Sequence, residues 1–207
     1  MTNLIPVTTI DLLRHGEPVG GSAFRGNTID DPLSEKGWQQ MWDAIGDASP
    51  WDQIISSPLE RCLAFAETLM DTYNIPCETI DDFKEVGFGS WAGRTADEIK
   101  VKNLSEYENF YLDPVNARPQ GAEPLDGFIQ RVTDSYNHCI EKYQGQHILI
   151  VAHAGVNRAI IANALHAAPV GLYRIKVNNA GISRIKHDKL GHHLLYHNVQ
   201  LADIITR

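Results

Sequence analysis

The stretch TTIDLLRHG at residues 8–16 decides the fold. β-Branched and apolar side chains dominate its first six residues, which predicts a buried strand. Gly16 and Pro18 are expected to end this strand, because both residues interrupt extended structure. Arg14 and His15 therefore follow directly on the end of a predicted strand.

Strands and helices alternate outward from this stretch. Further strands are predicted at 52–56, 77–80, 147–152, 172–177, 181–187 and 192–197. Helical spacing of apolar residues and helix-start signals predict helices at 34–45, 57–73, 95–110, 125–143 and 156–166. The segment 147–152 reads HILIVA, and such a nearly all-apolar strand is typical of a parallel sheet that is covered on both faces.

This alternation predicts an α/β protein with three layers, in which helices flank a mostly parallel central sheet. The chain contains no repeat and no linker-like tract, so a single domain is expected over 1–207. Ser57 is predicted to cap the helix after the second strand, with Pro58 at its first position and Glu60 completing a capping box.

The net charge and the cysteine content indicate which partners and which cellular compartment to expect. The net charge is −8 and the sequence pI is about 5.5, which argues against binding nucleic acid or an anionic membrane over a broad surface. The three cysteines have no C-x-x-C spacing, so free thiols in a reducing compartment are expected. No signal peptide or membrane-spanning stretch is recognised. A cytoplasmic protein is therefore expected.

Three polar groups follow predicted strands. Arg14 and His15 follow the first strand, Arg61 lies in the first turn of the helix after the second strand, and His153 ends the HILIVA strand. In open α/β sheets, ligands bind beyond the carboxyl ends of the strands. If these strands are parallel neighbours, the groups converge on one crevice although they are distant in sequence.

The residue types in this crevice suit a phosphoryl group. Arg14 and Arg61 can make bidentate contacts to a phosphate dianion. Helix starts at Pro58 and Ala154 offer free N–H groups to an anion. His15 is a suitable nucleophile, because one ring nitrogen can be held unprotonated near neutral pH.

Five segments resemble the histidine phosphatase superfamily, the phosphoglycerate mutase-like group. They are LLRHGE at 12–17, RGNTIDDPLSEKG at 25–37, SSPLERCLAFAETL at 56–69, EVGFGSWAG at 85–93 and VAHAGVNRAII at 151–161. Each segment is weakly specific alone, but all five occur in the order of the family. The resemblance implies a phosphoglycerate mutase-like fold and hydrolysis of a phosphate ester through a phosphohistidine intermediate.

The resemblance also implies roles for individual residues. It makes His15 the nucleophile, Glu85 the proton donor, and Arg14, Arg61 and His153 the rest of the phosphate pocket. It implies no metal and no cofactor. Contacts to the rest of a small-molecule substrate are expected from four further residues, Arg25, Gly26, Arg94 and Ala154.

One position departs from the family pattern. Family members often carry an asparagine six residues after the nucleophilic histidine, and this chain has Gly21 there. Ser22 and Asn27 are the nearby candidates to replace it. The departure concerns recognition of the leaving group more than the phosphoryl chemistry.

The segment ARPQGAEPLDGF at 117–128 and the size of the chain resemble bacterial α-ribazole-5′-phosphate phosphatases, which act late in cobalamin assembly. A broad-specificity metabolite phosphatase and a phosphoglycerate mutase remain alternatives within the family. A non-catalytic protein that binds phosphorylated ligands is the alternative outside it. The sequence leaves the oligomeric state open, a homodimer included.

The sequence argues against a metal site on the late histidines and against a nucleotide-binding P-loop. His187, His192, His193 and His197 lie on late predicted strands, but no carboxylate or cysteine at ligand spacing accompanies His193 and His197. Residues 21–28 imitate the glycine spacing of a P-loop but lack its lysine, which argues against nucleotide binding by that route.

Overall fold

The computed structural model describes residues 6–201 and 203, and its six strands form one sheet in the order β3-β2-β4-β1-β5-β6. The strands are β1 (Thr8–Arg14), β2 (Gln53–Ser56), β3 (Cys77–Thr79), β4 (His147–Ala152), β5 (Ile182–Asp188) and β6 (Gly191–Val199). The first four run parallel to one another, and β5 and β6 form an antiparallel extension beside β1. The predicted, mostly parallel sheet is therefore confirmed.

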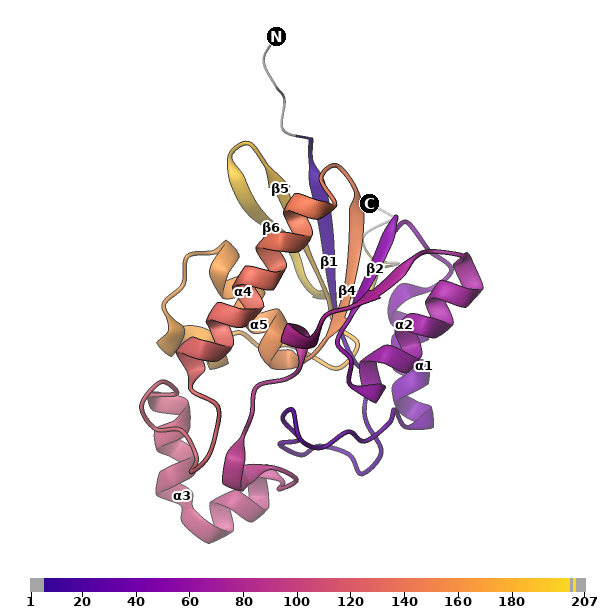
Figure 1. The fold of residues 1–207 in the computed structure, drawn as a ribbon. Helices are drawn as coiled ribbons and strands as arrows, with labels where there is room; N and C mark the ends of the chain where they lie inside the picture. The colour runs from indigo at the N-terminus through magenta and orange to yellow at the C-terminus, as the bar shows by residue number, and fades with distance from the viewer. Residues whose placement is uncertain (1–5, 202, 204–207) are drawn as a thin grey trace.

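Helices cover both faces of this sheet (Figure 1). Helices α1 (Glu35–Ile45) and α2 (Glu60–Tyr73) lie on one face, and α4 (Leu125–Lys142) and α5 (Ala154–Ala164) lie on the other. Helix α3 (Ala96–Leu112) lies beyond the end of the sheet at which β1 and β4 terminate.

Strand β4 shows why both faces need a helical layer. Ile148 and Ile150 pack into the core beneath α4 and α5, whereas Leu149 and Val151 pack into the core beneath α1 and α2. Alternate side chains of a strand point to opposite faces, so an all-apolar strand is stable only when both faces are buried. The three-layer α/β architecture follows from this pattern and is confirmed.

The two helices of the first layer begin differently. Ser34 caps α1 as its place in the sequence suggests, because its hydroxyl accepts a hydrogen bond from the Gly37 N–H at 3.0 Å. The predicted capping box at Ser57 is wrong, since α2 begins at Glu60 and has Leu59 as an uncapped N-cap residue. The Ser57 hydroxyl lies instead 2.7 Å from His153 Nε2.

The strand predicted at 172–177 is wrong. Residues 172–177 do not form a strand, because Pro169–Arg174 is a 3₁₀ helix, η3, and an irregular segment follows it. Two carbonyl groups of that segment accept hydrogen bonds from arginine side chains: Ile175 from Arg158 and Val177 from Arg14. Side chains therefore satisfy carbonyls that a neighbouring strand would otherwise have to satisfy.

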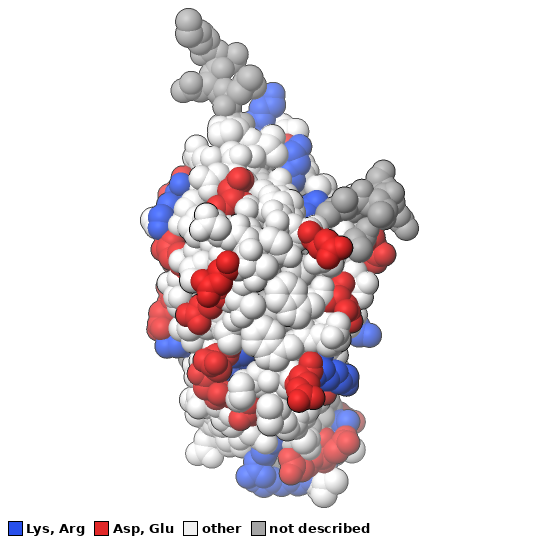
Figure 2. Space-filling view, turned by 90° about the vertical axis from the view of Figure 1, so that its right-hand side faces the viewer, with Lys and Arg blue, Asp and Glu red and all other residues white. Residues whose placement is uncertain are grey.

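The charge of the surface and the hydropathy of the helices are relevant to binding nucleic acid or a membrane. Figure 2 shows the face on the side of α1 and α2, where scattered acidic side chains surround a wide uncharged area. Neither this face nor the net charge of −8 offers a continuous basic surface of the kind that binds a polyanion. Among the described residues, no helix has the length and apolar character needed to cross a membrane.

Candidate functional site

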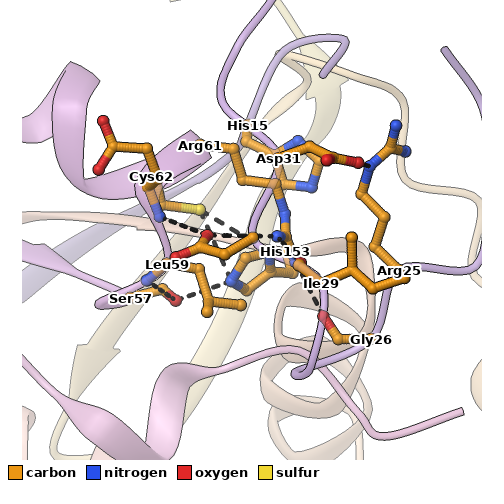
Figure 3. Close-up of polar contacts among 12 residues, drawn as sticks. His15, Arg25, Gly26, Ile29, Asp31, Ser57, Leu59, Arg61, Cys62 and His153 are labelled. Carbon is orange, nitrogen blue, oxygen red and sulfur yellow. Dashed lines mark hydrogen bonds and ion pairs between the residues drawn. The ribbon is translucent and has the colours of Figure 1, made fainter. Parts of the chain in front are cut away.

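A cavity of about 290 Å³ opens at the carboxyl ends of the parallel strands. The register of the sheet places Arg14 of β1 opposite Ala152 of β4, which brings residues that follow the two strands to one edge. Seven predicted site residues line this cavity: Arg14, His15, Arg25, Gly26, Arg61, Glu85 and Ala154. His153 lies behind the lining, with its ring centroid 5.2 Å from that of His15 (Figure 3).

His15 is held as a neutral imidazole. Its Nδ1 lies 2.7 Å from the carbonyl oxygen of Gly16, and because a carbonyl only accepts, Nδ1 carries the proton and Nε2 keeps its lone pair. Burial, together with the positive charges of Arg14 and Arg61, holds the pKa of His15 well below its usual value. The side chain is therefore prepared to act as a nucleophile at neutral pH.

His153 is completely buried and is oriented by α2 and its preceding turn. Its Nε2 lies 2.7 Å from the Ser57 hydroxyl, which also accepts a weaker bond from the Leu59 N–H at 3.3 Å (Figure 3). Burial and the nearby Arg61 hold the pKa of His153 well below its usual value. The second histidine is thus also neutral at neutral pH.

Arg14 and Arg61 present unused donors in a buried setting. Arg14 Nη1 donates to the Val177 carbonyl at 2.7 Å, and the Arg61 terminal nitrogens donate to Ile29 at 2.9 Å and Gly26 at 3.0 Å. The buried Nε atom of each arginine has no partner among the described residues. Burial lowers the pKa of Arg14 to about 10. Buried, unpartnered guanidinium donors are costly unless an anion satisfies them.

The counter-charge available to these arginines is small. Asp30 lies 3.8 Å from Arg61 Nη1, but its side chain is 48% exposed, so solvent screens the interaction. Two carboxyl groups, of Glu17 and Glu85, line the cavity beside four guanidinium groups, of Arg14, Arg25, Arg61 and Arg158. Glu17 is moreover paired with Lys36 at 2.9 Å. The site therefore has an excess of positive charge, which suits a phosphate dianion.

Glu85 is fixed at the N-terminus of α5. Its Oε1 accepts hydrogen bonds from the N–H groups of Val86 at 2.9 Å and Gly155 at 3.1 Å, and its Oε2 also lies 3.1 Å from the Gly155 nitrogen. A Cβ atom at Gly155 would lie 2.1 Å from Oε1. Glycine at this position therefore permits the carboxyl group to rest against the helix end.

The predicted substrate-binding residues divide into two groups. Gly26 and Ala154 line the cavity, and Ala154 is the first residue of α5, so its N–H has no acceptor within the helix. Arg25 also lines the cavity, but its three nitrogens donate to Asp31, Gly21 and Val19 and so hold the loop around it. Arg94 is exposed, does not line this cavity, and donates from Nε to the Ser90 carbonyl, so its contact with a substrate stays a prediction.

Several lining residues escape sequence reasoning. The cavity wall includes Phe24, Phe88, Tyr111, Arg158, Tyr173 and Asn179. Arg158 could have been predicted, because it lies four residues after Ala154 and therefore on the same face of a helix that starts at Ala154. Tyr173 and Asn179 could not, since they come from a segment predicted to be strand or loop and reach the site only through its path across the fold.

The late histidines lie away from this cavity. His197 contacts the Ser183 hydroxyl at 2.8 Å and the Lys176 carbonyl at 2.7 Å, and His193 lies 3.4 Å from Asp188. Within residues 6–201 and 203, no three His, Cys, Asp or Glu side chains gather into a group that could hold a metal ion.

Comparison with known proteins identifies the family. Residues 10–200 match the model of the histidine phosphatase superfamily, branch 1. The chain belongs to this superfamily. The resemblance seen in the five sequence segments is thereby confirmed.

Curated relatives include enzymes with different substrates. An adenosylcobalamin/α-ribazole phosphatase of Salmonella typhimurium is 28% identical over 84% of this chain and 88% of its own length. A metal-independent phosphoserine phosphatase of Arabidopsis thaliana is 30% identical over 86% of this chain and 75% of its own length. A bifunctional protein of Mycobacterium tuberculosis is 30% identical over 85% of this chain. The chain spans about half the length of this mycobacterial relative, 49%.

Solved structures of the superfamily share the fold. The Bacillus stearothermophilus protein YhfR superposes with a TM-score of 0.84 at 25% identity, over 93% of this chain and 97% of its own. The α-ribazole phosphatase of Shigella flexneri gives a TM-score of 0.77 at 26% identity, over 92% of this chain and 96% of its own. The predicted phosphoglycerate mutase-like fold is confirmed.

Proposed function

We propose that the protein is a metal-independent phosphomonoesterase that hydrolyses a small-molecule phosphate ester through a phosphohistidine formed on His15. One observation carries this proposal: a neutral, buried His15 lines the same cavity as the guanidinium groups of Arg14 and Arg61. Membership of the superfamily and the phosphatase names of its relatives support it.

The proposed reaction has two transfers. His15 Nε2 attacks phosphorus as the bond to the leaving oxygen breaks, and protonated Glu85 donates its proton to that oxygen. The deprotonated Glu85 then takes a proton from water, whose oxygen attacks phosphorus and breaks the P–N bond. The products are the free alcohol and inorganic phosphate, with His15 and Glu85 restored. Arg14, Arg61 and the start of α5 stabilise the charge on the transferred group.

The substrate we propose is α-ribazole-5′-phosphate. Two relatives of this specificity, from S. typhimurium and S. flexneri, support it. The cavity wall adds a physical argument, because Phe24, Phe88, Tyr111 and Tyr173 all line it. Aromatic side chains favour a leaving alcohol that carries a flat aromatic group, as α-ribazole carries its benzimidazole.

Phosphoserine is a second candidate substrate. The Arabidopsis phosphoserine phosphatase is the relative that favours it. Arg158 also favours it, because this arginine lines the cavity and uses its Nε for the Ile175 carbonyl, while its terminal nitrogens make no hydrogen bond with the described residues. A substrate carboxylate is a suitable acceptor for those terminal nitrogens.

Phosphate release in EDTA tests the proposal. The protein is supplied with p-nitrophenyl phosphate, α-ribazole-5′-phosphate or phosphoserine, as wild type, His15→Ala and the control His138→Ala. His138 is an exposed histidine of α4. We expect turnover by wild type and His138→Ala and a loss of about 10⁴-fold or more in His15→Ala. The ratio of kcat/KM for the two natural substrates decides between them.

A second readout addresses the intermediate directly. Rapid quenching of wild type with ³²P-labelled substrate should trap acid-labile, alkali-stable label on His15, and His15→Ala should carry none. Turnover by His15→Ala comparable to wild type would refute the nucleophile assignment. Tight phosphate binding without turnover of any of the three substrates would favour the binding-protein alternative, and isomerisation of a phosphoglycerate would favour the mutase.

A further inference from the structure

The segment of residues 175–181 crosses the end of β1 and is bonded directly to the site. The Val177 carbonyl accepts a hydrogen bond from Arg14 Nη1 at 2.7 Å, and the Ala180 N–H donates to the carbonyl of His15 at 3.3 Å. The Gly181 carbonyl accepts from the backbone N–H of Arg14 at 3.3 Å. The segment is therefore held against the two residues that begin the phosphate site.

Asn198 fixes the same segment from its outer side. Its Oδ1 accepts a hydrogen bond from the N–H of Asn178 at 2.8 Å, and its Nδ2 donates to the Lys176 carbonyl at 2.5 Å. Asn179 lies between Asn178, which is bonded to Asn198, and Ala180, which is bonded to His15. Its backbone position is thus set both by β6 and by the catalytic end of β1.

The Asn179 side chain is available to a ligand. It lines the cavity and is partly buried, and its amide group makes no hydrogen bond with any residue in 6–201 or with residue 203. Gly21, on the loop across the cavity, also lines it but contributes no side chain. Of the two residues that the sequence offers in place of an asparagine at position 21, Ser22 lines the cavity and Asn27 does not.

We propose that Asn179 donates from Nδ2 to a non-bridging oxygen of the phosphoryl group bound by Arg14 and Arg61. This rests on the proposed function of the cavity as a phosphate site. A phosphoryl group has three such oxygens, and the two guanidinium groups leave room for a neutral donor. The anchored segment fixes the backbone of Asn179 before the substrate arrives, so only side-chain rotation is needed to place the donor.

The adjacent Asn178 supplies a matched control. It is exposed, lies on the same segment and has the same side chain. Both asparagines line a second pocket beside α1, but only Asn179 also lines the cavity. The variants are Asn179→Ala, Asn179→Asp and Asn178→Ala. The measurements are the inhibition constant of inorganic phosphate, kcat/KM for p-nitrophenyl phosphate, and the melting temperature of each variant.

We expect Asn179→Ala to raise the phosphate inhibition constant about tenfold, which is typical for the loss of one hydrogen bond to a charged group. Asn179→Asp should raise it further, because a carboxylate repels phosphate, while Asn178→Ala stays within about twofold of wild type. Equal inhibition constants for Asn179→Ala and Asn178→Ala would overturn this inference with the proposed function intact. A wild-type protein that neither binds phosphate nor turns over a substrate would instead refute the proposed function.

Discussion

Strand β1 carries two charged groups whose surroundings differ, the fully buried Asp11 and the partly buried Arg14. The Asp11 carboxylate accepts two hydrogen bonds from Arg184, at 2.7 and 2.9 Å, one from Trp51 Nε1 at 2.9 Å and one from His147 Nε2 at 2.9 Å. Arg14 uses one terminal nitrogen for a carbonyl and leaves its buried Nε without a partner among the described residues.

The difference separates a structural charge from a binding charge. Burial alone would raise the pKa of Asp11, but the bonds from Arg184 and His147 hold it below its usual value. At Arg14 burial is the dominant influence, and its pKa falls to about 10. The partners of a fully bonded buried charge offset the cost of its desolvation, and removing one of them is destabilising, whereas a poorly bonded charge lacks that compensation until a ligand supplies it.

Removing Arg14 is the strongest test of this comparison. We expect Arg14→Met to lower kcat/KM by about 10³-fold, because a charge-stabilising donor at the phosphoryl group is lost. The free energy of unfolding should change by no more than about 1 kcal/mol, since a buried, poorly paired charge disappears with its one carbonyl bond. Steady-state kinetics and urea unfolding measure the two quantities.

Arg174→Met is the control for this variant, because Arg174 is exposed on η3. It should match wild type in both measurements. An Arg14→Met protein that is fully active, or that loses several kcal/mol of stability, would contradict the assignment of Arg14 to binding.

The opposite result is expected at Asp11. We expect Asp11→Asn to lower the free energy of unfolding by about 3 kcal/mol, because the buried side of Arg184 loses its counter-charge. The kcat of the folded fraction should remain near that of wild type, since Asp11 does not line the cavity. Urea unfolding with kinetics below the transition measures both, and Asp43→Asn on the exposed face of α1 is the control. A stable but inactive Asp11→Asn protein would contradict the assignment of Asp11 to structure and of Arg14 to binding.

The pH dependence of stability should show the smallest of these effects. The pKa values of His15 and His153 lie well below normal in the folded chain. Below about pH 6.5 these two histidines therefore bind protons in the unfolded chain but not in the folded chain. The free energy of unfolding consequently falls as the pH falls. Asp11 has a lowered pKa, so its contribution is present above about pH 4 and is lost only at lower pH.

Urea unfolding at pH 7.0 and 5.5 isolates the histidine contribution. Each site histidine should account for a fall of about 1 kcal/mol over this interval. The fall should be smaller in His15→Ala by that amount, and unchanged in His138→Ala. An identical pH dependence of stability in wild type and His15→Ala would show that His15 is not held neutral by the fold.

The site could be predicted only in part from the sequence. Arg14, His15, Arg61 and His153 are recognisable because each lies just after a predicted strand or at the start of a helix, and parallel strands end at one edge of a sheet. The sequence predicts a helix cap at Ser57, because local patterns show which groups a hydroxyl can reach along the chain. They do not show His153, which lies 96 residues away in sequence.

The sequence by itself determined the order of strands and helices except at 172–177, since apolar periodicity and capping residues act over a few neighbouring positions. It also determined that one strand is buried on both faces, which requires helices in two layers. The tertiary structure alone decided that Asn179 and Tyr173 line the cavity and that Arg94 does not. Those outcomes depend on the path of distant segments and on which backbone groups, such as the Val177 carbonyl, remain to be satisfied.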